Sequence, residues 1–388
     1  MEFRFFPLRF AFVAQEPINF PAGRSSNILR GAFGVLFRRL VCRPECIGPR
    51  FCPAAADCPY ARLFEPSALG PGPSGLKNRP RPFVFRASHL DGCTLRPGES
   101  FHFDLNLFDL HYPAAPHFIR AFSQLAQEGL GARRRRVSLV SVTKRRLNGQ
   151  PARELMAEVD AGESLVMEPE AISLLPQEAD VARVTVRFVT PTELKSGHMR
   201  EERPEFAILA ARIRDRISML STFYGDGPLE IDFRAFGDRA AAVRLTRCDL
   251  THVAVERRSS RTGQVHPLGG FVGEAEYEGP LTEFIPFLRV AAFTGVGRQT
   301  VWGKGQIELR QAGLGSEWKT GESAPQRKKE SPLVTGSRIE ERHYLVEEIT
   351  FQTSGTGGRT RRTPARLRPS GRCLPAPARA MGHPGCSR

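Results

Sequence analysis

Two hydrophobic periods alternate along the first half of the chain. Apolar and polar residues alternate, as in half-buried strands, over residues 2–14, 83–88, 101–109 and 136–143. Apolar residues instead recur at a helical period over residues 23–40 and 114–128. The order strand, helix, strand, strand, helix, strand is the ferredoxin-like pattern.

The same succession returns in the second half. Strand patterns cover residues 182–189, 243–256, 270–278 and 304–309, and helical patterns cover residues 204–222 and 281–293. We therefore predict an α+β fold of two tandem ferredoxin-like (RRM-like) domains. The predicted domains are residues 1–175 and 180–310.

Two segments do not fit this pattern. Residues 42–82 are rich in cysteine and proline, which predicts a long irregular insertion in the first domain. Residues 311–388 are rich in glycine, serine, proline and arginine, and they predict a disordered, basic, low-complexity C-terminal tail.

The charge balance narrows the choice of partner. The formal net charge is +15 and the sequence pI is about 10.0, which favours a polyanion such as a nucleic acid. No apolar run approaches the roughly 20 residues that span a bilayer, and Glu2, Arg4, Pro7 and Arg9 interrupt the apolar N-terminus. We expect a cytoplasmic protein without a membrane partner.

Four cysteines gather in the insertion with the spacing C-x3-C-x5-C-x5-C. Thiols or metal ligands are expected over disulfides in a cytoplasmic protein. Four thiolates can close a tetrahedral zinc site, which would then be structural. The candidate ligands are Cys42, Cys46, Cys52 and Cys58, and the alternative is a set of free thiols.

A glycine-rich segment, GVGRQTVWGKG, precedes the final predicted strand. Its glycines allow tight turns whose N–H groups can face phosphate oxygens. It lacks the Gly-Lys-Ser/Thr ending of a Walker loop, and it precedes a strand where a dinucleotide fingerprint would open a helix. The candidate phosphate contacts are Gly295, Gly297, Arg298, Gly303, Lys304 and Gly305, and the alternative is an ordinary connection.

Clusters of arginine supply further candidate phosphate contacts. The alternative for each cluster is a solvated charged edge. The residues concerned are Arg133, Arg134, Arg135, Arg136, Arg257, Arg258 and Arg261.

Several segments together resemble one known family. In the second half they are FVTPTELK (188–195), ARIRDRISMLSTFYGDG (211–227), VERRSSRTGQVHPLGGFVGEAEYEGPL (255–281) and FIPFLRVAAFTGVGRQTVWGKGQIEL (284–309). In the first half they are ILRGAFGVLFRRLVC (28–42), CPYARLFEP (58–66) and EGLGARRRRVSLVSV (128–142). In this order they resemble the CRISPR-associated repeat-RNA endoribonucleases, the sixth Cas family within the RAMP superfamily. The resemblance covers about residues 1–310 and is strongest in the second half.

The resemblance implies an activity and a mechanism. These enzymes cut CRISPR repeat RNA (pre-crRNA) into guide RNAs without a metal ion, by attack of a ribose 2′-OH on the adjacent phosphate. No cofactor is then needed for catalysis, and CRISPR effector subunits are candidate partners. Many relatives use a histidine near the first helix, but residues 1–88 contain none. The candidate catalytic residues are therefore His266, His111 and His89, with Lys304 or Arg298 as the stabilising cation.

Two other functions fit the same residues. The first is a non-catalytic RAMP-type subunit that binds crRNA within an effector complex. The second is a metal-stapled interaction module whose basic surface is incidental. RNA binding, with or without cleavage, distinguishes the three functions.

Overall fold

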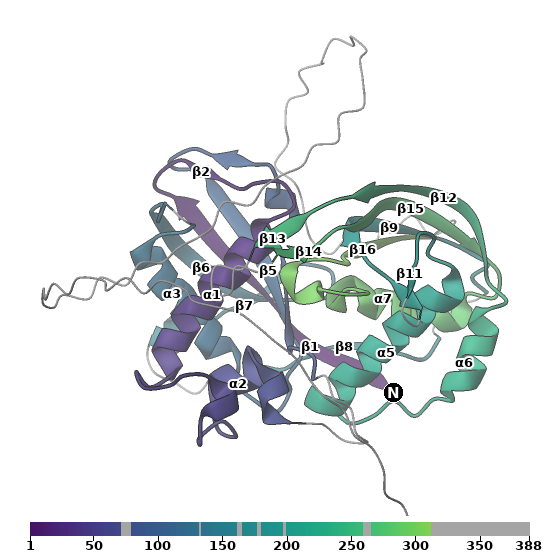
Figure 1. Ribbon diagram of the computed structural model, residues 1–388, viewed down its shortest axis with the longest axis horizontal. Helices are drawn as coiled ribbons and strands as arrows, with labels where there is room; N and C mark the ends of the chain where they lie inside the picture. The colour runs from purple at the N-terminus through teal and green to yellow at the C-terminus, as the bar shows by residue number, and fades with distance from the viewer. Residues whose placement is uncertain are drawn as a thin grey trace, which may run out of the picture. The chain divides into compact units, whose positions relative to one another are not determined.

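The computed structural model describes residues 1–70, 79–131, 133–160, 165–176, 180–196, 199–258 and 265–311. Each half of this described part forms an antiparallel sheet covered by helices (Figure 1). The described residues belong to one structural unit, Met1–Thr350. The tail predicted from residue 311 onwards lies outside them, except for Gln311, which ends the last strand.

The first half is built around one long strand. Its elements are β1 (Glu2–Ala14), β2 (Ile18–Asn19), α1 (Ser25–Val41), α2 (Pro59–Leu63), β3 (Phe83–Arg86), β4 (Thr94–Leu95), β5 (Ser100–Leu107), α3 (Ala115–Glu128), β6 (Val137–Arg145), β7 (Pro151–Glu154), α4 (Met156–Asp160) and β8 (Glu170–Ser173). The strand order is β3-β5-β1-β6-β7, and β8 pairs with the start of β1.

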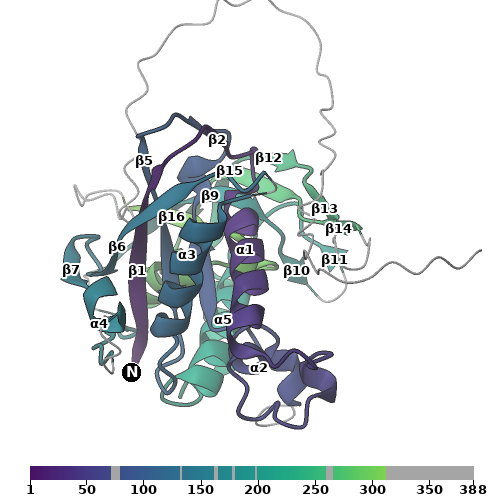
Figure 2. The same ribbon diagram turned by 90° about the vertical axis from the view of Figure 1, so that its left-hand side faces the viewer.

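Helices α1 and α3 lie side by side over one face of this sheet (Figure 2). Aromatic rings fill the space between helices and sheet. Phe33 of α1 stacks on Phe118 of α3 with ring centroids 4.0 Å apart. Phe10 of β1 stacks on Phe103, its register partner in β5. Burying rings of this size accounts for much of the stability of this core.

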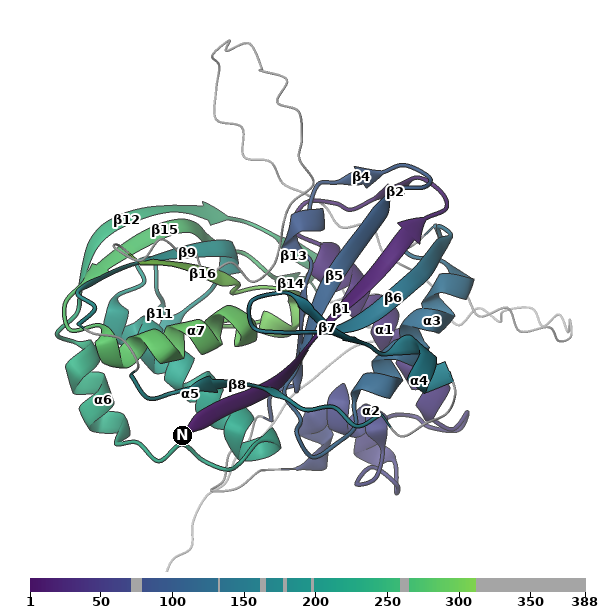
Figure 3. The ribbon, with the colours of Figure 1, turned by 180° about the vertical axis from the view of Figure 1, so that it is seen from behind.

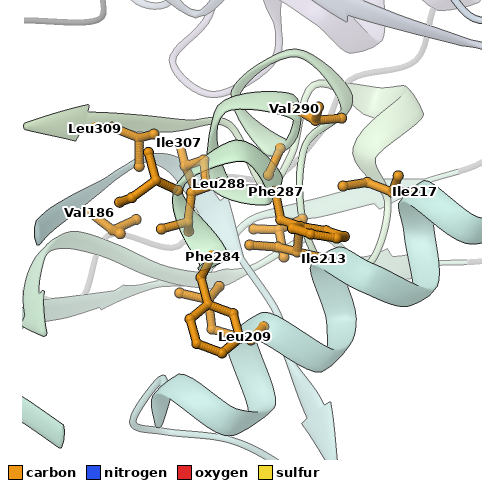
Figure 4. Close-up of a cluster of buried hydrophobic side chains, with 14 of the residues drawn as sticks. Val186, Leu209, Ile213, Ile217, Phe284, Phe287, Leu288, Val290, Ile307 and Leu309 are labelled. Atoms are coloured by element: carbon orange, nitrogen blue, oxygen red, sulfur yellow. The ribbon is translucent and has the colours of Figure 1, made fainter. Parts of the chain in front are cut away.

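The second half repeats the pattern of strands and helices. Its elements are β9 (Arg183–Thr192), β10 (Lys195–Ser196), β11 (Met199–Arg200), α5 (Phe206–Tyr224), α6 (Phe233–Ala240), β12 (Arg244–Val253), β13 (Glu256–Arg258), β14 (Val265–Pro267), β15 (Gly270–Glu278), α7 (Ile285–Thr294) and β16 (Ile307–Gln311). The main sheet has the order β12-β15-β9-β16. Leu209 and Ile213 of α5 meet Phe287 and Leu288 of α7 in the core beside the sheet (Figure 4).

Strand β1 belongs to both halves. Its first residues run along β8 at the edge of the second half (Figure 3). Phe3 and Phe5 are buried in the second core, whereas Leu8 and the residues after it face the first. The ring of Phe5 lies 4.7 Å from that of Phe293 in α7. The two halves therefore share a strand as well as an interface.

The structure confirms the mixed α+β class and the antiparallel sheets, and most predicted elements lie within three residues of the observed ones. The insertion predicted to be irregular contains α2, and α6 was not predicted. Among the described residues, no helix is both long and apolar enough to cross a membrane.

Candidate RNA interface

The glycine loop, residues 295–305, connects α7 to β16. Its four glycines have left-handed backbones, with φ of 74° at Gly295, 76° at Gly297, 77° at Gly303 and 68° at Gly305. A Cβ at Gly303 would overlap the Ser26 side chain, and one at Gly305 would overlap the carbonyl of Val296. The glycines thus allow the loop to close on itself and to approach α1.

Hydrogen bonds hold the loop against the end of β9. The N–H of Gly305 donates to the carbonyl of Pro191 at 3.2 Å, and the N–H of Gln306 donates to Thr190 Oγ1 at 3.0 Å. Arg298 donates to Glu193 through its backbone at 3.1 Å and through Nη1 at 2.9 Å. The FVTPTELK segment therefore supports the loop.

Lys304 fastens the loop to the start of α1. Its Nζ donates to the carbonyl of Gly23 at 3.1 Å, and the side chain is 3% exposed. Burial lowers the pKa of Lys304 to about 8, although the nearby Asp91 carboxylate opposes the shift. Lys304 therefore lies beneath the loop surface, whereas half of the Arg298 side chain is exposed.

Asp91 caps α1 from 66 residues away. Its Oδ1 accepts hydrogen bonds from the N–H groups of Arg24 and Ser25, at 3.0 and 2.9 Å, and from Ser25 Oγ at 2.6 Å. Burial raises the pKa of Asp91, and the bonds from Ser25 oppose that shift. Beside it, Ser88 Oγ donates to Gln306 Oε1 at 3.1 Å, so the turn at 88–91 also contacts the loop.

The β13–β14 hairpin borders the loop on another side. Gln299 Nε2 donates to the carbonyl of Pro267 at 2.8 Å. Strand pairing places Arg257 opposite His266 and Arg258 opposite Val265. The predicted contact Arg261 lies outside the described residues. The glycine loop, the start of α1, the turn at 88–91 and this hairpin are called the loop platform below.

The structure separates the three predicted histidines. His266 lies on the hairpin of the loop platform. His89 lies in the turn at 88–91, where its ring stacks on His102 and its Nε2 is 2.8 Å from the carbonyl oxygen of His102. His111 lies elsewhere, with its Nε2 2.8 Å from the carbonyl of Gly225 after α5.

The arginine cluster Arg133–Arg136 lies between α3 and β6. Arg134 has a left-handed backbone, with φ of 47°. Arg135 and Arg136 lie 4.0 and 3.7 Å from Glu16, while the side chains of Arg133 and Arg134 are exposed. This turn lies beside the end of β1 in space, since the N–H of Gln15 donates to the carbonyl of Arg136.

Sequence reasoning missed two parts of this region. One is Asp91, whose capping role depends on a contact that is distant in sequence. The other is Arg30, whose guanidinium lies 5.3 Å from the ring centroid of Trp302 and 4.5 Å from that of Phe64. Arg30 lies one helical turn after Ser26, which lies against Gly303 of the glycine loop. This spacing places both side chains on the same face of α1, and it was the only sequence signal for the contact between Arg30 and Trp302.

The four cysteines of the insertion are half-buried in their reduced form. Burial raises the pKa of Cys42 to about 12, and the nearby thiols of Cys58 and Cys46 add to the shift. In the described part of the chain, no group of three His, Cys, Asp or Glu side chains is arranged to hold a metal ion.

Each half of the chain matches a protein-family model. Residues 3–170 match the AF_1859_N family model, described as an N-terminal domain. Residues 186–307 match the model of the CRISPR-associated endoribonuclease Cas6. No curated protein matches the chain.

Solved structures show remote similarity. Thermus thermophilus Cas6 is 16% identical, covers 78% of this chain and 97% of its own, and has a TM-score of 0.43. A partial Cas6-RT-Cas1–Cas2 complex is 12% identical, covers 80% of this chain and 46% of its own, and has a TM-score of 0.47. A RAMP protein binding different RNA substrates is 9% identical, covers 79% of this chain and 100% of its own, and has a TM-score of 0.38.

The family match spans the glycine loop, the β13–β14 hairpin and the end of β9 that supports the loop. These segments are among those on which the sequence resemblance depended. Residues 186–307 of this chain match the model of the CRISPR-associated endoribonuclease Cas6 family, and the predicted resemblance is confirmed.

Proposed function

We propose that this chain is a metal-independent endoribonuclease that cuts CRISPR repeat RNA into guide RNAs. The match of residues 186–307 to the Cas6 family carries the proposal. In the reaction, a ribose 2′-OH attacks the adjacent phosphate and the 5′-oxygen leaves. The product is a 2′,3′-cyclic phosphate or its hydrolysis product.

The loop platform supports the assignment of the RNA-binding surface. It brings together glycine-loop N–H groups, the half-exposed Arg298 and the hairpin residues Arg257 and Arg258. Phosphate oxygens are bound by such a combination of backbone donors and guanidinium groups. We include Arg261 and Arg133–Arg136 as outer contacts along the RNA backbone.

Two histidines of the loop platform are assigned to proton transfer. We propose His266 as the first candidate, because its strand pairs with Arg257 next to the loop. His89 is the second, because its turn contacts Gln306 and caps α1. Each acid or base role contributes about 10²–10⁴ to the rate. His111 contacts the end of α5 and ranks third.

Lys304 contributes a charge beneath the loop. Its bond to Gly23 fixes the spacing between loop and helix. With a pKa of about 8, it is largely protonated at neutral pH and stabilises negative charge on a phosphate above the loop. Arg298 is the exposed cation, and its pairing with Glu193 orients it.

We also propose that the two halves are tandem ferredoxin-like domains, residues 1–175 and 180–310. Each contains the succession β-α-β-β-α-β, and the two strand orders correspond. In each sheet, the first and third strands of that succession are central neighbours. The shared strand β1 explains why the halves belong to one unit.

One observation favours a second function, a non-catalytic crRNA-binding subunit. Residues 1–88, which include α1, contain no histidine, and the Nε2 of His89 lies beside a carbonyl oxygen. Such a subunit would bind the repeat RNA with the same platform and leave it intact. Effector-complex subunits would then be its partners.

The test is cleavage of a labelled repeat RNA in EDTA, with a matched RNA carrying a 2′-deoxy nucleotide at the cut site. We expect cutting at one position and its loss with the deoxy substrate. The variants His266→Ala and His89→Ala should cut more slowly, and His252→Ala, at an exposed position of β12, is the matched control. Tight binding of the repeat RNA without cleavage would refute the nuclease and favour the non-catalytic crRNA-binding subunit. If the chain neither binds nor cuts the RNA, both proposed functions are refuted.

A further inference from the structure

Trp302 lies on a fixed turn of the glycine loop. The turn is a short 3-10 helix, Thr300–Trp302, and left-handed residues flank it, with φ of 63° at Gln299 and 77° at Gly303. The N–H of Trp302 donates to the carbonyl of Gln299 at 2.9 Å, and that of Gly303 donates to Thr300 at 3.0 Å. The backbone therefore holds the indole in one place before any ligand binds.

A guanidinium lies against one face of the indole. The Cζ of Arg30 is 5.3 Å from the ring centroid of Trp302, a distance at which a cation is attracted to an aromatic face. Arg30 is 6% exposed, so little water screens this attraction. It lies on a stripe of α1 that also contains Ser26 and Gly34, each one helical turn away.

The same guanidinium also lies over the ring of Phe64, 4.5 Å from its centroid. Phe64 is itself fixed, because Arg81 Nε donates to its carbonyl at 2.6 Å and a Cβ at Gly34 would overlap its ring. Arg30 therefore connects a well-packed ring at the end of α2 with the indole of the glycine loop, and it holds this indole against α1.

Trp302 is the only Phe, Tyr or Trp residue of the loop platform. It is half-buried, so part of its ring reaches the surface. Phe20, which precedes α1, is 1% exposed and is closed to a ligand. Arg298 lies in the same loop with half of its side chain exposed. The loop thus presents both an aromatic surface and a cation.

We propose that an unpaired base of the repeat RNA stacks on Trp302, and that Arg30 is the positioning residue that holds the indole for this contact. The proposal rests on the proposed function and adds a specificity-determining contact to it. Single-stranded nucleic acids are bound by aromatic rings that stack on bases together with cations that contact the backbone. A base can stack on a side chain only when it is unpaired, so Trp302 selects RNA that is single-stranded at this nucleotide. Because the turn and Arg30 fix the indole beforehand, stacking costs little side-chain entropy.

The first test uses the tryptophan fluorescence of the full-length chain, which has two tryptophans, Trp302 and Trp318. Trp318→Phe leaves Trp302 as the sole indole, and Trp302→Phe is the matched control. Each variant is titrated with a repeat RNA that has a 2′-deoxy nucleotide at the cut site, so that binding is measured without cleavage. Stacking should quench most of the emission of Trp318→Phe.

The second test removes one base at a time from this RNA. Abasic nucleotides replace successive positions around the cut site, and fluorescence anisotropy gives the affinities of the wild-type chain and of Trp302→Ala. Loss of one stack should weaken binding about 10-fold. At one position, the abasic RNA should bind the wild-type chain about 10-fold more weakly than intact RNA does, yet bind Trp302→Ala as well as intact RNA does.

Arg30→Met tests the positioning role, because methionine fills space but carries no charge. It should weaken binding of the intact RNA and leave the affinity for that abasic RNA unchanged, while Arg30→Lys should restore part of the loss. Arg39→Met, at the other end of α1, is the matched control and should have neither effect. A purely structural role of Arg30 would instead weaken binding of both RNAs equally.

Two results would overturn the proposal. They are an unchanged Trp302 emission when the RNA binds, and equal losses of affinity in the wild-type chain and Trp302→Ala at every abasic position. The nuclease proposal survives both results, since neither experiment measures cleavage. If the chain does not bind the repeat RNA, this proposal and the proposed function are refuted together.

Discussion

The substitution Gly303→Ala tests whether the glycine loop is packed on α1. Gly303 has φ of 77°, where an alanine backbone costs roughly 1–2 kcal/mol. The added Cβ would also overlap the Ser26 side chain, which is buried. Overpacking of this kind costs typically about 1–3 kcal/mol. The free energy of unfolding should therefore fall by about 2–5 kcal/mol.

Gly98→Ala is the matched control for the backbone cost. Gly98 has φ of 86°, and nothing lies within 4 Å of a Cβ built there. Its substitution should cost only the backbone part, about 1–2 kcal/mol. The double variant Ser26→Gly/Gly303→Ala removes the overlap. Its loss of stability should therefore be about 1–3 kcal/mol smaller than the sum of the losses in the two single variants.

The assay is urea unfolding followed by circular dichroism, with cleavage of the repeat RNA measured on the same samples. Gly303→Ala should slow cleavage, whereas Gly98→Ala should leave it unchanged. Equal losses of stability in Gly303→Ala and Gly98→Ala, together with additive losses in Ser26→Gly/Gly303→Ala, would refute the packing of this loop on Ser26.

Three further predictions follow from the loop platform. The folded pKa of Lys304, about 8, lies below its ordinary value of 10.5, so the unfolded chain binds more protons in that window. The free energy of unfolding should therefore rise between pH 8 and 10.5, by up to about 1.4 kcal/mol per pH unit. In urea unfolding, Lys304→Met should lack this rise. Parallel curves of unfolding free energy against pH for the two proteins would contradict the prediction. Asp91→Ala should cost about 2 kcal/mol through loss of the α1 cap, measured by thermal unfolding against the exposed control Asp238→Ala. Arg257→Ala should reduce the slope of log affinity against log salt by about 0.7, measured by fluorescence anisotropy, and Arg298→Ala should reduce it less because Glu193 already pairs with that guanidinium; equal reductions would contradict this.

The architecture was predictable because the longest elements have strong periods. Strand β1 alternates over 13 residues, and α5 repeats its apolar face over 19. Short elements give weaker signals. Helix α6 has eight residues, of which Phe236 and Ala240 are buried, and this apolar face is too narrow to stand out from a loop.

The candidate site was predictable only in part. The glycines and arginines were visible because their composition is locally unusual. The contacts that assemble the platform were not, since Lys304 reaches Gly23 across 281 residues and Asp91 reaches Ser25 across 66. A single sequence carries no local sign of such pairings, because each partner is an ordinary residue in its own segment.

The shared strand β1 affects the order in which the chain can fold during synthesis. Phe3 and Phe5 leave the ribosome about 300 residues before Ile307 and Leu309, yet they pack in the same core. The part of β1 from Leu8 onwards can reach its native contacts much earlier, since its core is complete by Leu165. Phe3 and Phe5 are thus buried later than the residues that follow them in β1, and a nascent chain must keep two exposed phenylalanines from aggregating until Ile307 and Leu309 have been made.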